Sequence, residues 1–393
     1  MPRRGCRTAW PRSASAQAGA MTSDERVWAA IRLETPDRVP LIPSLLPEPA
    51  ATLCGISQAE VAADVEAAVG AVFRVFDEYG GWDNPYPAPY TPLQLQAGGT
   101  FPLRMRIPGV DLPDDVPYQL DEAELLRPED YHTLAEVGFE QFYYDDFLWR
   151  IGDIKREELA GLQAEILRGG ALFLEACAAR SVRPLFLASA LHPFFTLSLM
   201  RSMVRFTEDL YYAPEPIERA LDRLTNDLIA TRLEFARQSG IDLWLLTEER
   251  ASAFFFPPAV FERFWWPYTR RIVEEFWANG IVTLFHLDTP WDKNLAYFKQ
   301  LPRGSAVLEL DGTTDIRAAK QLLGGHLCLK GDVPAALLSV GTAEEVRAYC
   351  RRLIDEVGTG GGFILSTGCS VPAGVRPENF RAMIETASRE GAC

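Results

Sequence analysis

The chain has 393 residues, of which 48% are hydrophobic and 24% are charged, a composition typical of a folded protein with a large core. Its net charge of −15, without a cluster of lysines and arginines, argues against nucleic acid or an anionic membrane as a partner. No apolar run is long enough for a membrane span. The seven scattered cysteines favour a reducing cytoplasm over a disulfide scaffold.

Residues 1–20 are basic but lack the apolar segment of a secretory signal. They are expected to be a disordered tail, or translation from a start codon upstream of the true one. Met21 reads as a natural beginning, with Ser23 as the N-cap of a first helix. Residues 21–393 show neither a linker nor an internal repeat and are expected to form one domain.

Two of the predicted strands lie near the N-terminus. RVPLIPSLL reads as a first strand and 58–79 as a helix, and a second strand is expected near 82–88, where prolines obscure the pattern. The less regular region 89–160 is expected to be an insertion of loops and helices over the mouth of the fold.

From about residue 180 onward, short apolar runs alternate with amphipathic helices. Strands buried on both faces of a parallel sheet have this continuous apolar character. In 216–240, Ile217, Leu221 and Leu224 recur at helical spacing, and Gly240 stands at the expected C-cap. The six runs are RPLFLASA, IDLWLLTE, IVTLFHLD, SAVLELDG, HLCLKGDV and GGFILSTG.

Eight strands alternating with helices predict an α/β fold, a single (β/α)8 TIM barrel with an irregular insertion over the barrel mouth. A doubly wound sheet is the alternative, but no G-x-G-x-x-G follows the first strand. Barrel enzymes carry their chemistry at the C-terminal ends of the strands. The polar residues predicted there are Glu248, Glu249, His286, Asp288, Asp311, Asp332 and Cys369.

His286 and Asp288 are two residues apart, so both should point to the same side of one strand. With Cys369 after the last strand, and Glu248, they form a ligand set suited to Zn²⁺, and Glu249 is predicted to orient a ligand or move a proton. The alternative is that His286 hydrogen-bonds within its loop and Cys369 packs as a small apolar side chain.

The mouth is also predicted to be rich in aromatic residues, which would suit a flat substrate. Asp83 and Tyr86 are the predicted substrate-binding residues, although turn chemistry explains Asp83 equally well. The aromatic residues of this prediction are Trp82, Tyr86, Tyr90, Phe194, Phe195, Phe254 and Phe255.

Three segments carry a resemblance to a known family. ERVWAAIRLETPDRVPLIP, LKGDVPAALLSVGTAEEV and GGGFILSTGCSVPAGVRPENFRAMIETA resemble the uroporphyrinogen decarboxylase superfamily, in the right order and from about residue 24 to 389. The resemblance implies a (β/α)8 barrel, in agreement with the alternation of strands and helices. It also implies one of two activities, decarboxylation of a tetrapyrrole or cobalamin-dependent methyl transfer.

Decarboxylases of this superfamily hold an octacarboxylate substrate with arginines that follow the first strand. Residues 39–73 contain neither lysine nor arginine, which disfavours that substrate. The zinc-binding methyltransferases instead have a histidine at the end of a strand, a cysteine two residues on, and Gly-Cys after the last strand. His286 and Gly368-Cys369 match this pattern, and Asp288 replaces the middle cysteine, which would make the zinc a stronger Lewis acid.

The resemblance therefore implies a corrinoid-dependent methyltransferase that acts on a small-molecule methyl donor or acceptor. The corrinoid would be supplied by a partner protein, because no D-x-H-x-x-G motif occurs in this chain. Residues 108–131 resemble a subgroup associated with O-demethylation of methoxylated aromatic compounds. The alternatives are a decarboxylase acting on a less charged tetrapyrrole, and a non-catalytic corrinoid- or porphyrin-binding barrel.

Overall fold

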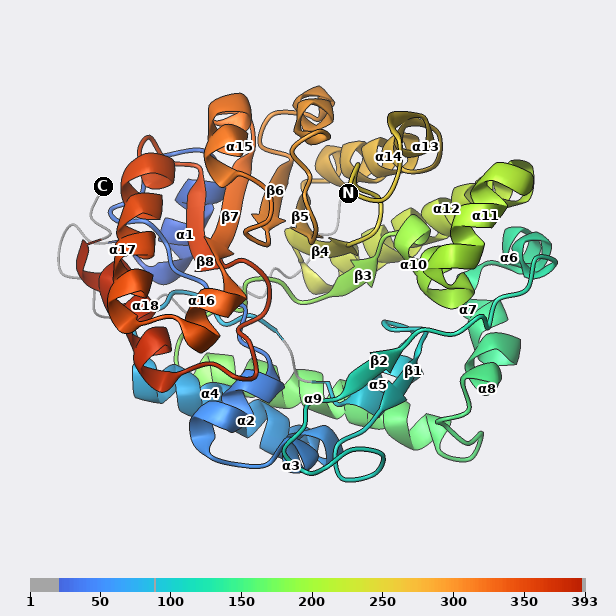
Figure 1. Cartoon of the computed structure of the whole chain (residues 1–393), viewed down its shortest axis with the longest axis horizontal. Helices are drawn as coiled ribbons and strands as arrows, with labels where there is room; N and C mark the ends of the chain where they lie inside the picture. Colours follow the sequence, from blue (N-terminus) through green and yellow to red (C-terminus); the bar gives the residue numbers. More distant parts are fainter. Residues whose placement is uncertain (1–20, 88–89, 391–393) are drawn as a thin grey trace, which may run out of the picture.

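The computed structural model describes residues 21–87 and 90–390, and its centre is a parallel sheet in which strands adjacent in sequence pair side by side (Figure 1). Helices cross over between consecutive strands, as parallel pairing requires. Every residue of β5 to β8 is buried, which explains their continuous apolar sequence. The strands are β3 (Ser189–Leu191), β4 (Leu243–Glu248), β5 (Val282–Leu287), β6 (Ala306–Leu310), β7 (Cys328–Val333) and β8 (Phe363–Thr367).

Two short extended segments, residues 40–42 and 83–85, take the places of the first two strands and complete the eight-membered barrel. Residues 40–42 join β8 through backbone hydrogen bonds of 2.8 and 2.9 Å to Leu365. One bond of 2.9 Å joins residues 83–85 to 40–42, and another of 3.0 Å joins them to Leu185, ahead of β3. The prolines of these segments lack the N–H that would extend the hydrogen-bond ladder, so both extended segments are short. The predicted (β/α)8 barrel is confirmed.

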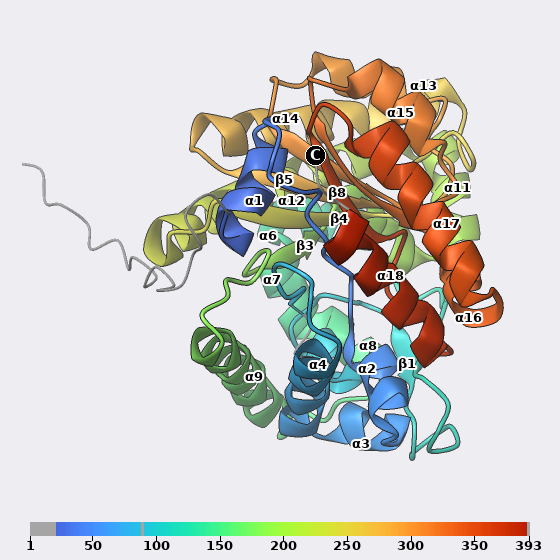
Figure 2. The same cartoon turned by 90° about the vertical axis from the view of Figure 1, so that its left-hand side faces the viewer.

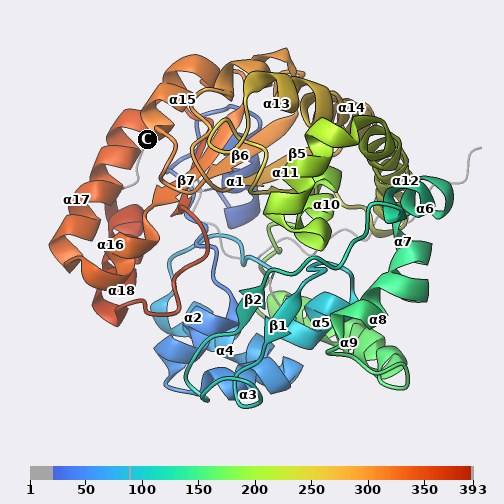
Figure 3. The same cartoon turned by 45° about the vertical axis from the view of Figure 1, so that its right-hand side comes forward.

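The helices form an outer ring around the strands (Figures 1 and 3). The first begins with Thr22 as its N-cap, in a capping box with Glu25, so the prediction of Ser23 is wrong by one residue. The helices are α1 (Ser23–Ile31), α2 (Pro47–Cys54), α3 (Gln58–Ala63), α4 (Val65–Tyr79), α9 (Leu159–Ala179), α10 (Pro193–Arg201), α11 (Met203–Tyr212), α12 (Pro214–Ser239), α13 (Pro258–Phe264), α14 (Trp266–Ala278), α15 (Ile316–Leu323), α16 (Ala335–Val340), α17 (Ala343–Leu353) and α18 (Pro377–Glu390).

The region between α4 and α9 is the irregular insertion. It reaches the segments that follow the C-terminal ends of two strands: Leu126 N donates to Met200 O after β3 (2.8 Å), and Glu122 pairs with Arg250 after β4 (2.7 Å). The insertion thus lies over the barrel mouth, as predicted. Its elements are α5 (Pro92–Ala97), the antiparallel pair β1 (Arg104–Arg106) and β2 (Gln119–Asp121), α6 (Asp130–Val137), α7 (Phe139–Phe142), a π-helical turn (Tyr143–Phe147) and α8 (Leu148–Ile151).

Among the described residues, no helix combines the length and the hydropathy needed to cross a membrane. The cysteines of this part of the chain are all free thiols. Helices α4 and α2 lie between α9 and α18 on the side of the molecule that faces the viewer in Figure 2. The predictions made for residues 1–20 fall outside the described residues.

Candidate metal centre

Strand β5 places an imidazole and a carboxylate at the mouth of the barrel. His286 is the fifth residue of this fully buried strand, and Asp288 follows directly after its end. The two side chains face each other, with His286 Nε2 3.2 Å from Asp288 Oδ1. The predicted placement of both residues on one side of the strand is therefore confirmed.

The turn after β8 brings a thiol to the same point. Cys369 Sγ lies 3.7 Å from His286 Nε2 and 3.6 Å from Asp288 Oδ2. Gly368 permits this approach, because a Cβ at that position would lie 2.3 Å from the carbonyl oxygen of Asp311. One ligand atom from each of the three residues lies within 4.8 Å of the other two. His286, Asp288 and Cys369 are called the HDC cluster below.

A buried ionic network supports the histidine from inside the barrel. Glu309, which pairs in register with His286, lies with Oε1 3.1 Å from His286 Nδ1. Its other oxygen lies 2.9 Å from Lys330 Nζ. Lys330 also donates to Ser44 (2.9 Å) and Ser366 (2.7 Å), and Ser44 donates to Glu309 (3.0 Å). The network links β5, β6, β7, β8 and the segment that follows residues 40–42 beneath the cluster.

The charges of this network stabilise one another. Burial would raise the pKa of Glu309, but Lys330 and His286 lower it to about 2. Burial lowers the pKa of Lys330 more than Glu309 raises it. Burial also opposes protonation of His286, but Asp288, Cys369 and Glu309 together raise its pKa well above the ordinary value. In the metal-free protein the acceptors around His286 therefore favour the protonated imidazole against the effect of burial.

This arrangement fits a zinc ion. Nitrogen, oxygen and sulfur donors converge, and three protein ligands would leave one coordination position open. The buried Oδ1 of Asp288 makes no well-aligned hydrogen bond among the described residues, and its polar neighbour is His286 Nε2 at 3.2 Å, so two donor atoms face the same point. Glu309 at Nδ1 holds the tautomer that presents the Nε2 lone pair to the cluster, so it would act from outside the ligand set.

Comparison with known proteins supplies the family. The sequence model of uroporphyrinogen decarboxylase (URO-D) matches residues 184–390, just over half of the chain. The chain belongs to the uroporphyrinogen decarboxylase family. A sequence match to a methyltransferase of Methanosarcina mazei agrees with the expected resemblance to the methyltransferase-like branch, and a solved methyltransferase structure from the same organism shares the fold.

Three relatives illustrate the range of this family. A uroporphyrinogen decarboxylase of Syntrophotalea carbinolica is 26% identical over 234 residues, 60% of this chain and 62% of that protein. Methylcobamide:CoM methyltransferase MtbA of M. mazei is 25% identical over 150 residues, 38% of this chain and 42% of that protein. The solved structure of a methyltransferase from M. mazei superposes with a TM-score of 0.68 at 15% identity, covering 93% of this chain and 98% of that one. The first curated relatives are matched over a quarter to about three fifths of their length.

Two neighbouring glutamates of this family member have different surroundings. Thr247 is the register partner of His286, so Glu248 points to the opposite face of β4, where its carboxylate accepts from Trp265 Nε1 (2.8 Å). Glu248 thus lies outside the HDC cluster, and its assignment as a ligand is corrected. Glu249 lies near the cluster: burial, and then the charge of Asp288, raise its pKa to about 7, against the opposing effect of His286.

The two predicted substrate-binding residues also differ. The carboxylate of Asp83 is fully buried and pairs with Arg26 (2.6 Å) and Arg38 (2.9 Å), so its function is to hold α1 against the barrel. The assignment of Asp83 to the substrate is therefore corrected. Tyr86 lies beside the buried network, with Lys330 Nζ 5.1 Å from the centre of its ring. Burial, followed by the charge of Glu309, raises its pKa well above the ordinary value.

Sequence reasoning missed several residues of this site. Glu309 and Lys330 sit within apolar strands, where a charged residue is itself a signal that a buried partner exists. Tyr118 of the insertion lies close enough to Glu48 and Cys369 for their charges, after the larger effect of burial, to raise its pKa. No local pattern in the insertion indicates this position.

Proposed function

We propose that this protein is a zinc-dependent methyltransferase that exchanges a methyl group with a corrinoid carried by a partner protein. The observation that carries the proposal is the convergence of His286, Asp288 and Cys369 at the C-terminal end of the barrel, where barrel enzymes place their chemistry. A zinc ion held by these residues would act as a Lewis acid at its open coordination position and would activate the group that gains or loses the methyl.

The residues around the HDC cluster have separable functions in this proposal. Glu309 keeps the imidazole of His286 in one orientation and one tautomer. Glu249, with a pKa of about 7, is suited to take up or release a proton near neutral pH. Tyr86 and Tyr118 approach from the barrel and from the insertion, so they would form apolar walls that exclude water from the reacting groups.

The similar proteins and the sequence support a proposal for the substrate class. The name of MtbA includes methylcobamide, and residues 108–131 resemble the subgroup associated with O-demethylation. We therefore propose a methoxylated aromatic compound as the methyl donor. The exposed edge-to-face pair Phe254 and Phe255, in the loop after β4, offers an aromatic surface on this face of the barrel.

The second candidate is a decarboxylase, because the family and several curated relatives carry that name. The charge of the mouth argues against uroporphyrinogen as its substrate. Glu48, Glu249 and Asp288 are acidic, and the basic residues of the network, His286 and Lys330, already face Asp288 and Glu309. A polycarboxylate would meet net repulsion here.

Zinc content and methyl transfer test the proposal together. Purified protein should contain about one zinc per chain, and it should transfer a methyl group between methylcobalamin and a small acceptor. His286→Ala and Cys369→Ala should lose both zinc and transfer. The matched controls His132→Ala and Cys54→Ala alter an exposed histidine and a half-buried free thiol elsewhere, so they should keep both.

The outcomes separate the candidates. Formation of coproporphyrinogen at about 1 per second or faster would favour the decarboxylase. Zinc without transfer of methyl to or from any corrinoid would favour a non-catalytic corrinoid-binding barrel. Full retention of zinc in His286→Ala would remove the metal site from the proposal altogether.

A further inference from the structure

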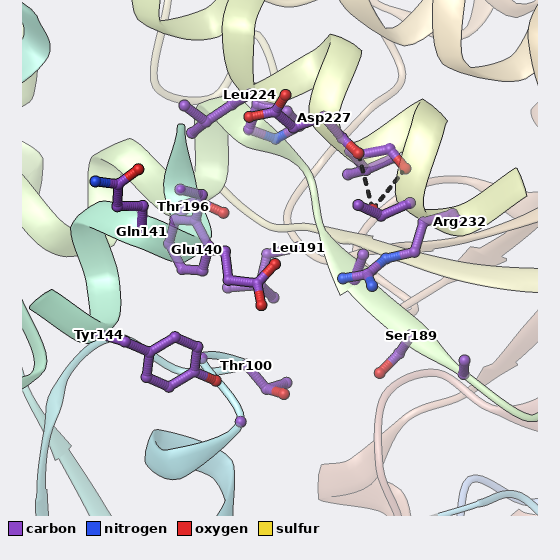
Figure 4. A pocket seen from close by; sticks show the side chains of 18 of the residues that line it. Thr100, Glu140, Gln141, Tyr144, Ser189, Leu191, Thr196, Leu224, Asp227 and Arg232 are labelled. Atoms are coloured by element: carbon purple, nitrogen blue, oxygen red, sulfur yellow. Dashed lines mark hydrogen bonds between the residues drawn. The ribbon is translucent and has the colours of Figure 1, made fainter. Parts of the chain in front are cut away.

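A cavity lies beside β3 and α12, away from the HDC cluster. Its volume is about 910 Å³, and none of His286, Asp288 and Cys369 lines it. Its walls come from β3, α9, α12 and the insertion. The volume falls within the range of cavities that enclose small organic ligands. Figure 4 shows polar and aromatic side chains from these elements pointing toward a common space.

One arginine on the cavity wall, Arg232, makes no ion pair with any residue that the structure describes. Arg232 of α12 lies with its guanidinium carbon 5.3 Å from the centre of the Trp244 ring. Stacking of this kind leaves the N–H donors at the edge of the guanidinium plane free to bind an anion. Its Nε is buried and has no hydrogen-bond partner in the described part of the chain. Burial lowers the pKa of Arg232, and the charge of Glu140 only partly opposes this. An arginine so placed is stabilised by a bound anion.

The other charges of the cavity define which anion fits. Arg223 is already paired with Asp227 (2.8 Å). Glu140 lies at the exposed rim and would repel a second negative charge on the ligand. One free guanidinium next to one free carboxylate therefore suits a monoanion better than a phosphate dianion. In Figure 4, Tyr144 reaches into the space from the side across from Arg232, where it can contact a ring.

We propose that this cavity binds an aromatic monocarboxylate, with the carboxylate on Arg232 and the ring toward Tyr144. The site is separate from the HDC cluster and does not depend on the proposed methyl transfer. Serine and threonine hydroxyls from β3 and the insertion, Ser189 and Thr100, are on hand to hydrogen-bond substituents of the ring. A ligand that matched these features would have the chemistry of a substituted benzoate.

Isothermal titration of metal-free protein with benzoate tests this site, and benzamide serves as the uncharged isostere. Benzoate should bind saturably and benzamide should not. Arg232→Met should weaken benzoate binding about tenfold to hundredfold, the usual worth of a charged hydrogen bond. Arg237→Met removes an arginine five positions along the same helix that pairs with Glu234 and does not line the cavity, so it should bind as the wild type does.

Three further outcomes decide the proposal. Unchanged benzoate affinity in Arg232→Met would overturn it, as would the absence of saturable binding up to about 10 mM, well above a millimolar Kd. Tighter binding of phenyl phosphate than of benzoate would contradict the charge argument. If Arg232→Met does not fold, Leu228→Trp provides a second test, because its indole would occupy the cavity and should abolish benzoate binding while Arg232 remains.

Discussion

Replacing Glu309 with glutamine removes the anion at the centre of the buried network. The carboxylate contacts His286 (3.1 Å), Lys330 (2.9 Å) and Ser44 (3.0 Å), and all of these are inside the barrel. Loss of one partner from a buried ion pair leaves the other charge uncompensated, at a cost of about 3–5 kcal/mol. The fall in the pKa of Glu309 from 4.5 to about 2 corresponds to roughly 3 kcal/mol of preference for the ionised form, which agrees with the cost of breaking the pair.

Urea unfolding of metal-free protein measures this effect. At pH 7 we expect Glu309→Gln to lower the free energy of unfolding by about 3 kcal/mol. The double variant Glu309→Gln, Lys330→Met should lose less than the sum of the two single changes, because the lone charge is gone. Glu208→Gln, which breaks an exposed pair with Arg205, is the matched control and should cost less than about 1 kcal/mol.

The pH dependence gives a second reading of the same variant. The pKa of Glu309 is lowered on folding, so its stabilisation is present above its ordinary value of 4.5 and is lost as the pH falls toward 2. The difference in the free energy of unfolding between wild type and Glu309→Gln should therefore become smaller as the pH falls through this range. A cost of Glu309→Gln below about 1 kcal/mol at pH 7, or additive single changes, would refute the account of the network.

Three other changes separate structural residues from the HDC cluster. Glu248→Gln should leave zinc content unchanged. Burial raises the pKa of Glu248 from 4.5 to about 8, so the wild type should lose stability as the pH rises across that interval. The variant should not lose it, and urea unfolding at several pH values measures the difference. Asp83→Asn leaves Arg26 and Arg38 without their shared buried anion and should cost about 3 kcal/mol in urea unfolding with zinc content intact, whereas zinc loss in the folded variant would contradict the structural assignment. Asp288→Cys should tighten zinc binding in competition with a chelator, and weaker binding would show that Asp288 is not a ligand.

The barrel and the meeting of His286, Asp288 and Cys369 at its mouth could be predicted, because both follow from the periodicity of the strands. An apolar strand that ends in His-x-Asp fixes both side chains on one face, and the closing strand places Cys369 beside them. The same rule misassigned Glu248. The end of the run IDLWLLTE does not show whether Glu248 or Glu249 faces the mouth, and a shift of one residue exchanges the two faces.

The remaining errors come from contacts between distant segments. Asp83 begins the extended segment of residues 83–85, and nothing near it in sequence shows that Arg26 and Arg38 reach its carboxylate. Glu309 and Lys330 are visible in the sequence as charges within apolar runs, but their pairing depends on the register between β6 and β7, where Glu309 and Lys330 are partners. Register of this kind follows from the closed barrel and not from either strand alone.

Closure of the ring by residues 40–42 and β8 also sets the order of events during biosynthesis. The amide of Ser44 donates to Thr367 Oγ1, a contact that spans 323 positions of the chain. The pairing of residues 40–42 with β8 therefore cannot form until nearly the whole polypeptide has left the ribosome, and that edge of residues 40–42 stays unpaired until then. Contacts of such long range slow folding and expose strand edges to aggregation. Cys369 emerges after β8, so the HDC cluster can form only once the barrel is able to close.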